Sequence, residues 1–507
     1  MGGNFQSPSR KLSAVSPAKR QASGEAVLQI QAGMALTHLR LHPGEEIRTP
    51  RILMLFWQGD RIRGNNMLRR FILKYHRPRP NGKPLTLPII LSGWGGTAAS
   101  EHLKNIQRII EHDLPIECYW IDAEWFGEGS WWNQPGNWPV KQDLYPHGFR
   151  PISETLHQSG RQFLLWVEPQ RVCKDTPWYQ FKERENWLLE LGNGEDSYKQ
   201  WKTGGWPFPH EDSRWIICES RRSQMNPDEL LFNLGNPDAR RFLTDFIAQR
   251  IDEFGLDWYR EDANIAPLEY WRHTDKPDRQ GITEIRYVEG IYNFWDELLQ
   301  RYPHLMIDNC ASGGRRIDLE SISRSTALHR TDWARDSIHA QCHSYGLFHW
   351  VPLHMAARGA ALKKGNEYEI RSVMTAGLMT RLWDEGDGEM AHDAKRLLEQ
   401  YLSIQKFYYG DYYPLTPYSQ DNTVWLAWQF DCPEDGEGMV QAFRREESVY
   451  ESAQFKLRGL SPDANYIVRN IDSCGSEEIT GRVLMEKGLV VNIPGQPGAV
   501  VITYKKK

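Results

Sequence analysis

Several apolar segments of this 507-residue chain end in acidic side chains. Carboxyl groups can donate a proton, accept one or act as nucleophiles, so these residues are the first candidates for catalysis. Asp122, Glu168, Asp262, Asp308 and Asp332 each follow or close a short apolar run. Two carboxyl groups on opposite sides of an acetal can cleave it, since one protonates the departing oxygen and the other stabilises the oxocarbenium-like carbon. Because paired carboxylates repel, one pKa of such a pair rises into the range of a useful acid. The acidic segments therefore predict acid/base chemistry on an acetal, the linkage that joins sugars.

Tryptophan is abundant, and three Trp residues stand near the acidic segments. The chain has 21 Trp, and Trp94, Trp125 and Trp333 lie at or beside the ends of candidate strands. Aromatic rings are platforms for the apolar faces of sugars, which favours a carbohydrate ligand. The alternative is that these Trp residues belong to the core, and that single Asp residues at strand ends are helix caps or turn residues. Several such features at successive strand ends favour the functional interpretation.

The sequence gives little support to metal catalysis. It has no H-x-x-x-H pair on a predicted helix and no His cluster at the predicted strand ends. Asp and Glu alone could hold Mg²⁺, but no phosphate-cradling loop accompanies them. We therefore expect neither a metal site nor a cofactor.

The acidic segments belong to an alternating pattern in residues 86–412. Short apolar runs alternate there with amphipathic stretches, as in parallel strands joined by helices. Helices are expected over 99–112, 236–255 and 287–302. The eight candidate strands are residues 88–94, 116–123, 163–169, 256–264, 305–311, 326–332, 347–353 and 372–378. This pattern predicts an α/β fold, a (β/α)8 TIM barrel with its active site at the carboxyl ends of the strands. A doubly wound sheet is the alternative, but no Gly-rich loop follows the first strand.

The segments on either side of the barrel are expected to fold differently. Residues 1–24 are basic and rich in Ser and Pro, and are expected to be a disordered tail. Residues 25–85 contain short β-rich runs and are interpreted as a remnant of an N-terminal β-domain with its linker, with exposed apolar surface as the consequence. Residues 413–507 lack helical signals and predict a C-terminal antiparallel β-sandwich.

Composition and charge limit the classes of partner. A net charge of −5 gives no reason to expect nucleic acid or an anionic membrane. No apolar run reaches membrane-spanning length, and the N-terminus lacks the apolar core of a secretory signal, so a cytoplasmic protein is expected unless a leader precedes Met1. The seven Cys are scattered without a C-x-x-C pair, which argues against a disulfide framework or structural zinc. A small oligosaccharide or glycoconjugate is the expected partner, and the sequence is compatible with a homo-oligomer.

Taken in order, the strand-end motifs resemble glycoside hydrolase family 36, the α-galactosidases and their relatives. The motif LDWYREDAN (256–264) resembles that family's LDYLKWDMN, and DNCASGGRRIDL (308–319) resembles ESCSGGGGRFDL. The motif HRTDW (329–333) stands where the family has WTSDN, and YWIDAEWF (119–126) resembles VLDDGWF. The resemblance spans about residues 36–410 and implies the same barrel fold.

The resemblance also implies roles for individual residues. Asp262 matches the nucleophile that forms the glycosyl-enzyme intermediate, and Asp332 matches the acid/base. Asp122 matches the first of two carboxylates that bind sugar hydroxyls at C4 and C6. The further candidate substrate-binding residues are Glu124, Trp125, Arg260, Asn264, Cys310, Ser312, Gly313 and Arg316, with Trp94 and Trp333 added by their location.

Four positions depart from the family pattern, all on the substrate side. Ala123 replaces the second sugar-binding carboxylate, and Glu124 occupies a Gly position. Arg260 replaces a Lys, and a guanidinium and an ammonium are not interchangeable as hydrogen-bond donors. His329 stands where the family has Trp. Since both catalytic aspartates are retained, these departures bear on the sugar rather than on the reaction.

The resemblance implies a retaining glycoside hydrolase that releases terminal α-linked galactose by double displacement through a covalent glycosyl-aspartate. Retaining enzymes hold their two carboxyl groups about 5–5.5 Å apart, and inverting enzymes about 6.5–9.5 Å apart. An α-N-acetylgalactosaminidase and an α-galactosyl transglycosylase would use the same aspartates, so both alternatives stay open. A non-catalytic carbohydrate-binding protein is the alternative from another class.

Overall fold

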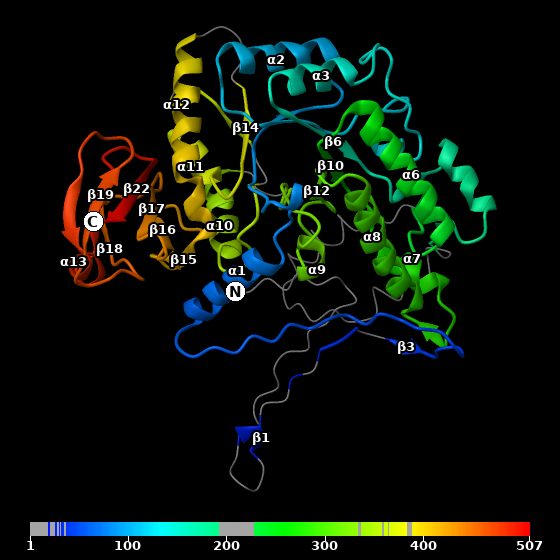
Figure 1. The fold of residues 1–507 in the computed structure, drawn as a ribbon, viewed down its shortest axis with the longest axis horizontal. Coiled ribbons are helices and arrows are strands. Elements are labelled where there is room, and N and C mark those ends of the chain that lie inside the picture. Colours follow the sequence, from blue (N-terminus) through cyan, green and yellow to red (C-terminus); the bar gives the residue numbers. More distant parts are fainter. Residues whose placement is uncertain are drawn as a thin grey trace.

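A seven-stranded parallel sheet forms the centre of the molecule, in the order β12-β10-β6-β5-β4-β14-β13 (Figure 1). The computed structural model describes residues 19–20, 26–27, 30, 32–34, 37–191, 228–332, 336–356, 359–363, 365–382 and 388–507. The strands are β4 (Ile89–Gly93), β5 (Cys118–Ile121), β6 (Gln162–Val167), β10 (Trp258–Glu261), β12 (Met306–Asn309), β13 (Ala360–Ala361) and β14 (Leu378–Arg381). Nearly all their residues are buried, so the strands read as continuous apolar runs rather than alternating ones.

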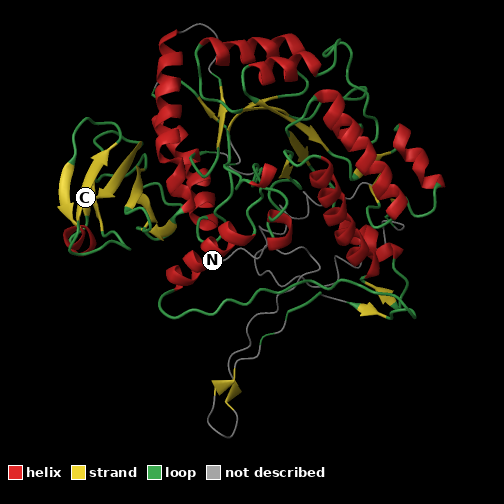
Figure 2. Ribbon diagram, in the orientation of Figure 1, coloured by secondary structure: helices red, strands yellow, loops and turns green. Residues whose placement is uncertain are grey.

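Helices cover the outer side of this sheet, as Figure 2 shows in red. They are α1 (Arg61–Tyr75), α2 (Ala99–Glu111), α3 (Arg150–Gln158), α6 (Pro237–Phe254), α7 (Pro267–Thr274), α8 (Ile282–Arg301), α9 (Leu319–Ile322), α10 (Ser337–Leu347), α11 (Glu367–Val373) and α12 (Gly388–Ile404). The described residues also form the short 3-10 helices η1 (Pro80–Gly82), η2 (Trp131–Asn133), η3 (Pro177–Glu183) and η4 (Gln405–Tyr409). A parallel sheet surrounded by helices is the expected TIM-barrel type of fold, and that prediction is confirmed.

The three helices predicted from amphipathic spacing are present. Helix α6 begins as expected, because the Asn236 side chain accepts hydrogen bonds from two backbone N–H groups of the first turn and Pro237 occupies the first helical position. It ends at Gly255, whose φ of 69° lies in the left-handed region that favours glycine. Helices α2 and α8 lie where they were expected, with ends shifted by at most five residues.

Two of the eight predicted strands are wrong. Leu347 closes α10, and the run 347–353 contains no strand; the next sheet contact is a single parallel bridge between Ala327 and His354. The run 372–378 begins inside α11, and the strand starts only at Leu378. The sixth candidate, 326–332, contributes only isolated bridges at its first two residues. Short apolar runs do not distinguish a buried helical turn from a strand, which explains these errors.

Between β6 and α6 the chain forms a small antiparallel sheet. Its strands are β7 (Arg171–Cys173), β8 (Leu188–Leu189) and β9 (Glu229–Phe232), in the order β7-β9-β8. This sheet lies in sequence just after the carboxyl end of β6, and it positions Arg171 beneath the strand-end cluster described below.

Residues 37–75 differ from the expected β-domain remnant. Among the described residues before α1, the strands are two residues long: β1 (Lys19–Arg20), β2 (Ala26–Val27) and β3 (His38–Leu39), the last paired with β11 (Arg279–Gln280). Residues 61–75 form helix α1 instead, because Asp60 caps its first turn and apolar residues recur at helical spacing. The expected exposed apolar surface is confirmed: Ile52, Leu53, Met54, Phe56 and Trp57 are 43–72% exposed.

The chain from Asp411 onward is antiparallel, and it lies to one side of the barrel (Figure 1). One sheet has the order β15 (Asp411–Pro414), β16 (Trp425–Cys432), β17 (Glu437–Arg444), β22 (Gly498–Lys506), β19 (Asn465–Asn470) and β20 (Glu477–Thr480). A second sheet pairs β18 (Ser452–Phe455) with β21 (Leu489–Asn492), and helix α13 (Gly481–Glu486) follows β20. Residues from both sheets share one apolar cluster, so this part is a β-sandwich, as predicted.

Within the described residues, no helix is long and apolar enough to cross a membrane. The six cysteines in that part of the chain are free thiols.

Candidate active site

Asp262 directly follows β10, at the carboxyl end of the central sheet. Strand β10 pairs in parallel with β6 and β12, and Glu261 is opposite Val167 and Asn309. The Asp262 N–H donates to the carbonyl of Val167, 3.0 Å away. This register brings the residues that follow three neighbouring strands to one edge, where barrel enzymes place their active sites.

Four hydrogen-bond donors surround the Asp262 carboxylate. Trp166 Nε1 and Asn264 Nδ2 donate to Oδ2 at 3.1 and 3.0 Å. The backbone N–H groups of Ala263 and Ser312 donate to Oδ1 at 2.8 and 3.1 Å. The residue is only 7% exposed, so these bonds fix the orientation of the carboxylate in the site.

The surroundings of Asp262 favour its ionised form. Burial alone would raise its pKa, but the charge of Arg260 and the hydrogen bonds from Ser312 and Trp166 lower the pKa below its ordinary value. Arg260 is itself buried, forms an ion pair with Asp308, and lies over the Trp120 ring with 4.4 Å to the centroid. A buried carboxylate that stays ionised is what a nucleophile requires.

The turn after β12 connects Asp262 to the segment that carries Asp332. Ser312 has a φ of 50° and Gly313 a φ of 87°, and the Ser312 hydroxyl donates to Asn264 Oδ1 at 2.7 Å. A Cβ on Gly313 would come within 3.0 Å of the Thr331 backbone, so only glycine allows this approach. The Gly314 N–H donates to the Arg330 carbonyl at 2.9 Å. The turn predicted to line the site therefore packs directly against the residues before Asp332.

Asp332 differs from Asp262 in exposure and in partner. Its side chain is 49% exposed, and Oδ1 lies 2.8 Å from His329 Nε2. The His329 ring makes an edge contact with Trp120, with 6.2 Å between centroids. Asp332 thus stands at the open side of the cluster, where a group that exchanges protons with solvent would be expected.

Asp122 and Cys310 lie within the same cluster of charges. Burial raises the pKa of Asp122, against the lowering effect of Arg260, and the charge of Asp262 raises it further. Cys310 is buried, and its Sγ accepts the Gly313 N–H at 3.3 Å. Burial and the charge of Asp262 raise the pKa of the Cys310 thiol, so it is neutral and serves as part of the wall.

Glu124, the residue after Ala123, has partners in the protein for both of its carboxylate oxygens. One of its oxygens forms an ion pair with Lys141 at 3.2 Å, and the other accepts the Trp131 N–H at 2.9 Å. Its φ of 86° is unusual for a residue with a side chain, which agrees with a position where glycine is normally preferred. Both oxygens are thus engaged by the loop beyond β5, and the role of Glu124 toward a sugar stays a prediction.

Two more predicted contacts are corrected by burial and pairing. Trp125 is 1% exposed and packs in the core against Phe126, Trp138, Phe149 and Phe254, so its ring faces no ligand. Arg316 donates to Glu261 and to Gln170, each at 3.0 Å. Successive side chains of a strand point to opposite faces, so Glu261 lies on the face of β10 opposite to Arg260. Arg316, which pairs with Glu261, therefore lies on that opposite face.

The aromatic candidate Trp94 does lie at the surface, with 47% exposure. A network absent from the sequence prediction supports its loop: Tyr145 donates to the Gly95 carbonyl at 2.8 Å, and His102 contacts Tyr145 and Tyr119 at 3.2 and 2.9 Å. Burial lowers the pKa of His102 to about 4, so the ring is neutral. Trp333, the third aromatic candidate, lies outside the described residues.

Sequence reasoning missed the residues that hold the carboxylates in place. Trp166 donates to Asp262. It lies opposite Arg260 on the neighbouring strand β6, a register that only the structure shows. Glu168, noted only as a strand-end carboxylate, is fully buried; it pairs with Arg171 at 2.6 Å and accepts the Asn264 N–H. Within the described part of the chain, no group of three or more His, Cys, Asp or Glu residues could hold a metal ion.

Comparisons with known proteins agree with this arrangement. The family model described as Melibiase matches residues 47–202 and 208–365, and the model for the glycosyl hydrolase family 36 C-terminal domain matches residues 425–503. The α-galactosidase AgaA of Geobacillus stearothermophilus is 22% identical over 454 residues, 87% of this chain and 58% of its own length. The α-galactosidase Mel36A of Lactobacillus acidophilus is 23% identical over 464 residues, 89% of this chain and 58% of its own length.

Solved structures show the same fold. An AgaA variant in complex with 1-deoxygalactonojirimycin superposes with a TM-score of 0.69 at 20% identity, covering 88% of this chain and 58% of that one. The α-galactosidase of Lactobacillus brevis gives a TM-score of 0.69 at 18% identity, with the same coverage. This chain therefore spans just under three fifths of the length of the relatives that it matches. Because the Melibiase model covers more than half of its residues, the chain belongs to the melibiase family, glycoside hydrolase family 36.

Proposed function

We propose that this chain is a retaining glycosidase that releases terminal α-linked galactose, with Asp262 as nucleophile and Asp332 as acid/base. The observation that carries the proposal is the asymmetry of the two aspartates. Asp262 is buried, held by four donors and kept ionised, whereas Asp332 is half exposed beside His329. Double displacement requires one group that attacks as a carboxylate and another that gives up and regains a proton.

In the first step, an Asp262 oxygen attacks the anomeric carbon while the bond to the departing oxygen breaks. Asp332 gives its proton to that oxygen. In the second step, Asp332 takes a proton from water, and the water oxygen displaces Asp262, which leaves as a carboxylate and restores the original anomeric configuration. The N–H donors from Ser312, Ala263 and Trp166 stabilise the charge that returns to Asp262.

The sugar is proposed from the family and from one retained contact. Asp122 is the carboxylate proposed to bind the C4 and C6 hydroxyls, and burial together with the charge of Asp262 raises its pKa. Variants of the relative AgaA were crystallised with stachyose and with raffinose, which supports a small oligosaccharide as substrate. Ala123 carries no carboxylate, and Glu124 is paired with Lys141, so one expected sugar contact is altered. The preference for a particular group at C6 of the sugar is therefore the part of the proposal that most needs a test.

The test is release of nitrophenol from an aryl α-galactoside by the full chain and by three variants. Asp262→Asn and Asp332→Asn should each lose at least about 100-fold in kcat/KM, since each removes a group that acts in the transition state. Asp257→Asn is the matched control: it changes an Asp just before the same strand, at the opposite end from the site. Equal losses in all three variants would indicate misfolding and not catalysis.

Product analysis separates the remaining alternatives. Nuclear magnetic resonance of the first product should show α-galactose; an initial β-anomer would mean inversion and would overturn the role of Asp262. Faster turnover of the aryl α-N-acetylgalactosaminide would reassign the sugar and leave the mechanism intact. Galactosyl transfer to an added sugar in preference to water would identify a transglycosylase. Saturable galactose binding without turnover of any aryl glycoside would favour a non-catalytic binding protein.

A further inference from the structure

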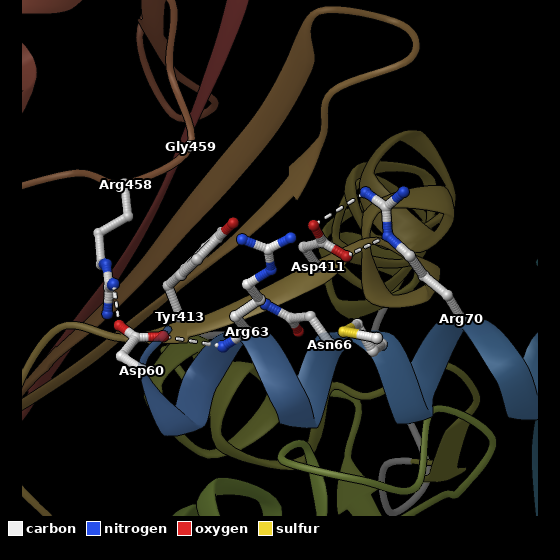
Figure 3. A pocket seen from close by; sticks show the side chains of 9 residues that line it. Asp60, Arg63, Asn66, Arg70, Asp411, Tyr413, Arg458 and Gly459 are labelled. Atoms are coloured by element: carbon white, nitrogen blue, oxygen red, sulfur yellow. Dashed lines mark hydrogen bonds and ion pairs between the residues drawn. The ribbon is translucent and has the colours of Figure 1, made fainter. Parts of the chain in front are cut away.

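A second cavity lies away from the aspartate cluster, where helix α1 meets the C-terminal β-sandwich. Its volume is about 440 Å³, within the range of small-ligand sites. Asp60, Arg63 and Arg70 line it from the barrel side, and Asp411, Tyr413 and Arg458 line it from the sandwich side (Figure 3). None of these residues belongs to the candidate active site.

Ion pairs between helix α1 or its cap and the sandwich border this cavity, and Arg70 also pairs with Glu434 at 2.8 Å. Asp60 caps α1 by accepting the Arg63 N–H at 2.9 Å, and its other oxygen pairs with Arg458. Arg70 binds Asp411 through two hydrogen bonds of 2.7 and 2.9 Å. Each pair joins the helix to the sandwich, so the cavity lies between two parts that are already fixed to each other.

Three polar groups at the cavity have no partner in the described part of the chain. The Arg63 guanidinium forms no hydrogen bond or ion pair there, and neither does the Tyr413 hydroxyl. Asp431 is 3% exposed; Oδ1 accepts the Tyr504 hydroxyl at 2.7 Å, but Oδ2 is unpaired. Figure 3 shows Arg63 and Tyr413 pointing into the same space.

Gly459 shows that two of these atoms face one gap. This glycine lines the cavity with a φ of 79°, and a Cβ placed on it would be 3.0 Å from Asp431 Oδ2 and 3.1 Å from the Tyr413 hydroxyl. Any side chain here would therefore occupy the space in front of both oxygens. Because Gly459 has no side chain, this space stays open between the acceptor Asp431 Oδ2 and the Tyr413 hydroxyl, which can donate or accept.

We propose that this cavity is a second binding site for a neutral, hydroxyl-rich ligand of one or two sugar units. The unpaired groups supply a donor fork, an acceptor and a hydroxyl, which match the mixed donors and acceptors of adjacent sugar hydroxyls. One unpaired Arg and one unpaired carboxylate leave no net charge to favour an anion or a cation. The site does not depend on catalysis at Asp262, and it would hold part of a longer substrate or a product.

Calorimetric titration of the catalytically disabled Asp262→Asn protein with raffinose tests this site. Two binding events are expected, one in the barrel and one in the cavity. Adding Arg63→Met or Tyr413→Phe should weaken one event at least about 10-fold, as expected for a lost hydrogen bond to a charged or buried group, and leave the other unchanged. Arg61→Met is the matched control, an exposed Arg two residues away on the same helix that does not line the cavity.

The outcomes separate this site from the proposed catalytic function. If every binding event survives both Arg63→Met and Tyr413→Phe, or if no event is detected at all, the second site does not exist. If the protein turns over no galactoside but one event remains and both variants remove it, the proposed function fails while the second site stands. Melting temperatures equal to that of the Arg61→Met control show that the variants are folded.

Discussion

Replacing Asp431 by Asn should stabilise the protein at neutral and alkaline pH but not in acid. Asp431 lies on β16 with 3% exposure, and its Oδ1 accepts the Tyr504 hydroxyl. Burial raises its pKa from the ordinary 3.8 to about 6; the Tyr504 hydroxyl opposes this rise, and the charges of Asp411 and Glu434 add to it. The folded protein therefore holds this proton more tightly than the unfolded chain does.

The sign and the size of the effect follow from that shift. The folded-state pKa is the higher one, so the stabilisation from protonated Asp431 is complete below about pH 4 and is lost as the pH rises through about 6. A shift of about two pKa units corresponds to about 3 kcal/mol of unfolding free energy. Asn cannot ionise, and its side-chain oxygen can still accept the Tyr504 hydroxyl.

Urea denaturation of both proteins from about pH 4 to about pH 8 measures the difference directly. The Asp431→Asn protein should match wild type near pH 4 and exceed it by up to about 3 kcal/mol near pH 8. Asp435→Asn, an exposed residue four positions later, is the control and should show no such trend. A stability difference that does not change with pH, or a wild type that is more stable at pH 8, would refute the reasoning.

Three further changes test other parts of the structure. Arg69 is fully buried and donates to the carbonyls of Phe348, Tyr408 and Gly410 at 2.7–2.8 Å, so Arg69→Met should cost about 3–5 kcal/mol of unfolding free energy; a melting temperature equal to wild type would contradict this. Tyr145→Phe frees the Gly95 carbonyl beside Trp94, so KM for an aryl α-galactoside should rise severalfold with kcat nearly constant, and an unchanged KM would count against that loop as part of the site. His329→Phe removes the hydrogen-bond partner of Asp332, so kcat/KM should fall about 10-fold, less than in Asp332→Asn; full activity would show that His329 has no role in proton transfer.

The residues that follow the predicted strands were the part of the sequence from which the site could be predicted. A parallel sheet brings the carboxyl ends of its strands to one edge, whatever the positions of its helices. Asp262, Asn264 and the Ser312–Gly313 turn are joined by hydrogen bonds, as their positions after two neighbouring strands implied. The C-terminal sandwich could also be predicted from the sequence, since its strands are separated by turns and contain no competing helical pattern.

What could not be predicted is the pairing of charged side chains that are far apart in sequence. Lys141 engages Glu124 from 17 residues away, and Glu261 engages Arg316 from 55 residues away. Glu124 and Arg316, each considered alone, are reasonable sugar ligands near a strand end. Only the fold supplies the partner, and the partner decides whether a carboxylate or guanidinium remains available for a ligand.

Two departures from the family pattern meet at a single residue, Trp120. Arg260, in place of a Lys, covers the Trp120 ring and pairs with Asp308, while His329, in place of a Trp, contacts the edge of the same ring and binds Asp332. A guanidinium can lie flat on an aromatic face in a way that an ammonium cannot, and an imidazole is smaller than an indole. Both departures therefore contact Trp120, one over the face of its ring and the other at its edge. Because Arg260 also lowers the pKa of Asp262, and His329 is the partner of Asp332, these two residues act on both proposed catalytic groups and not only on sugar contacts.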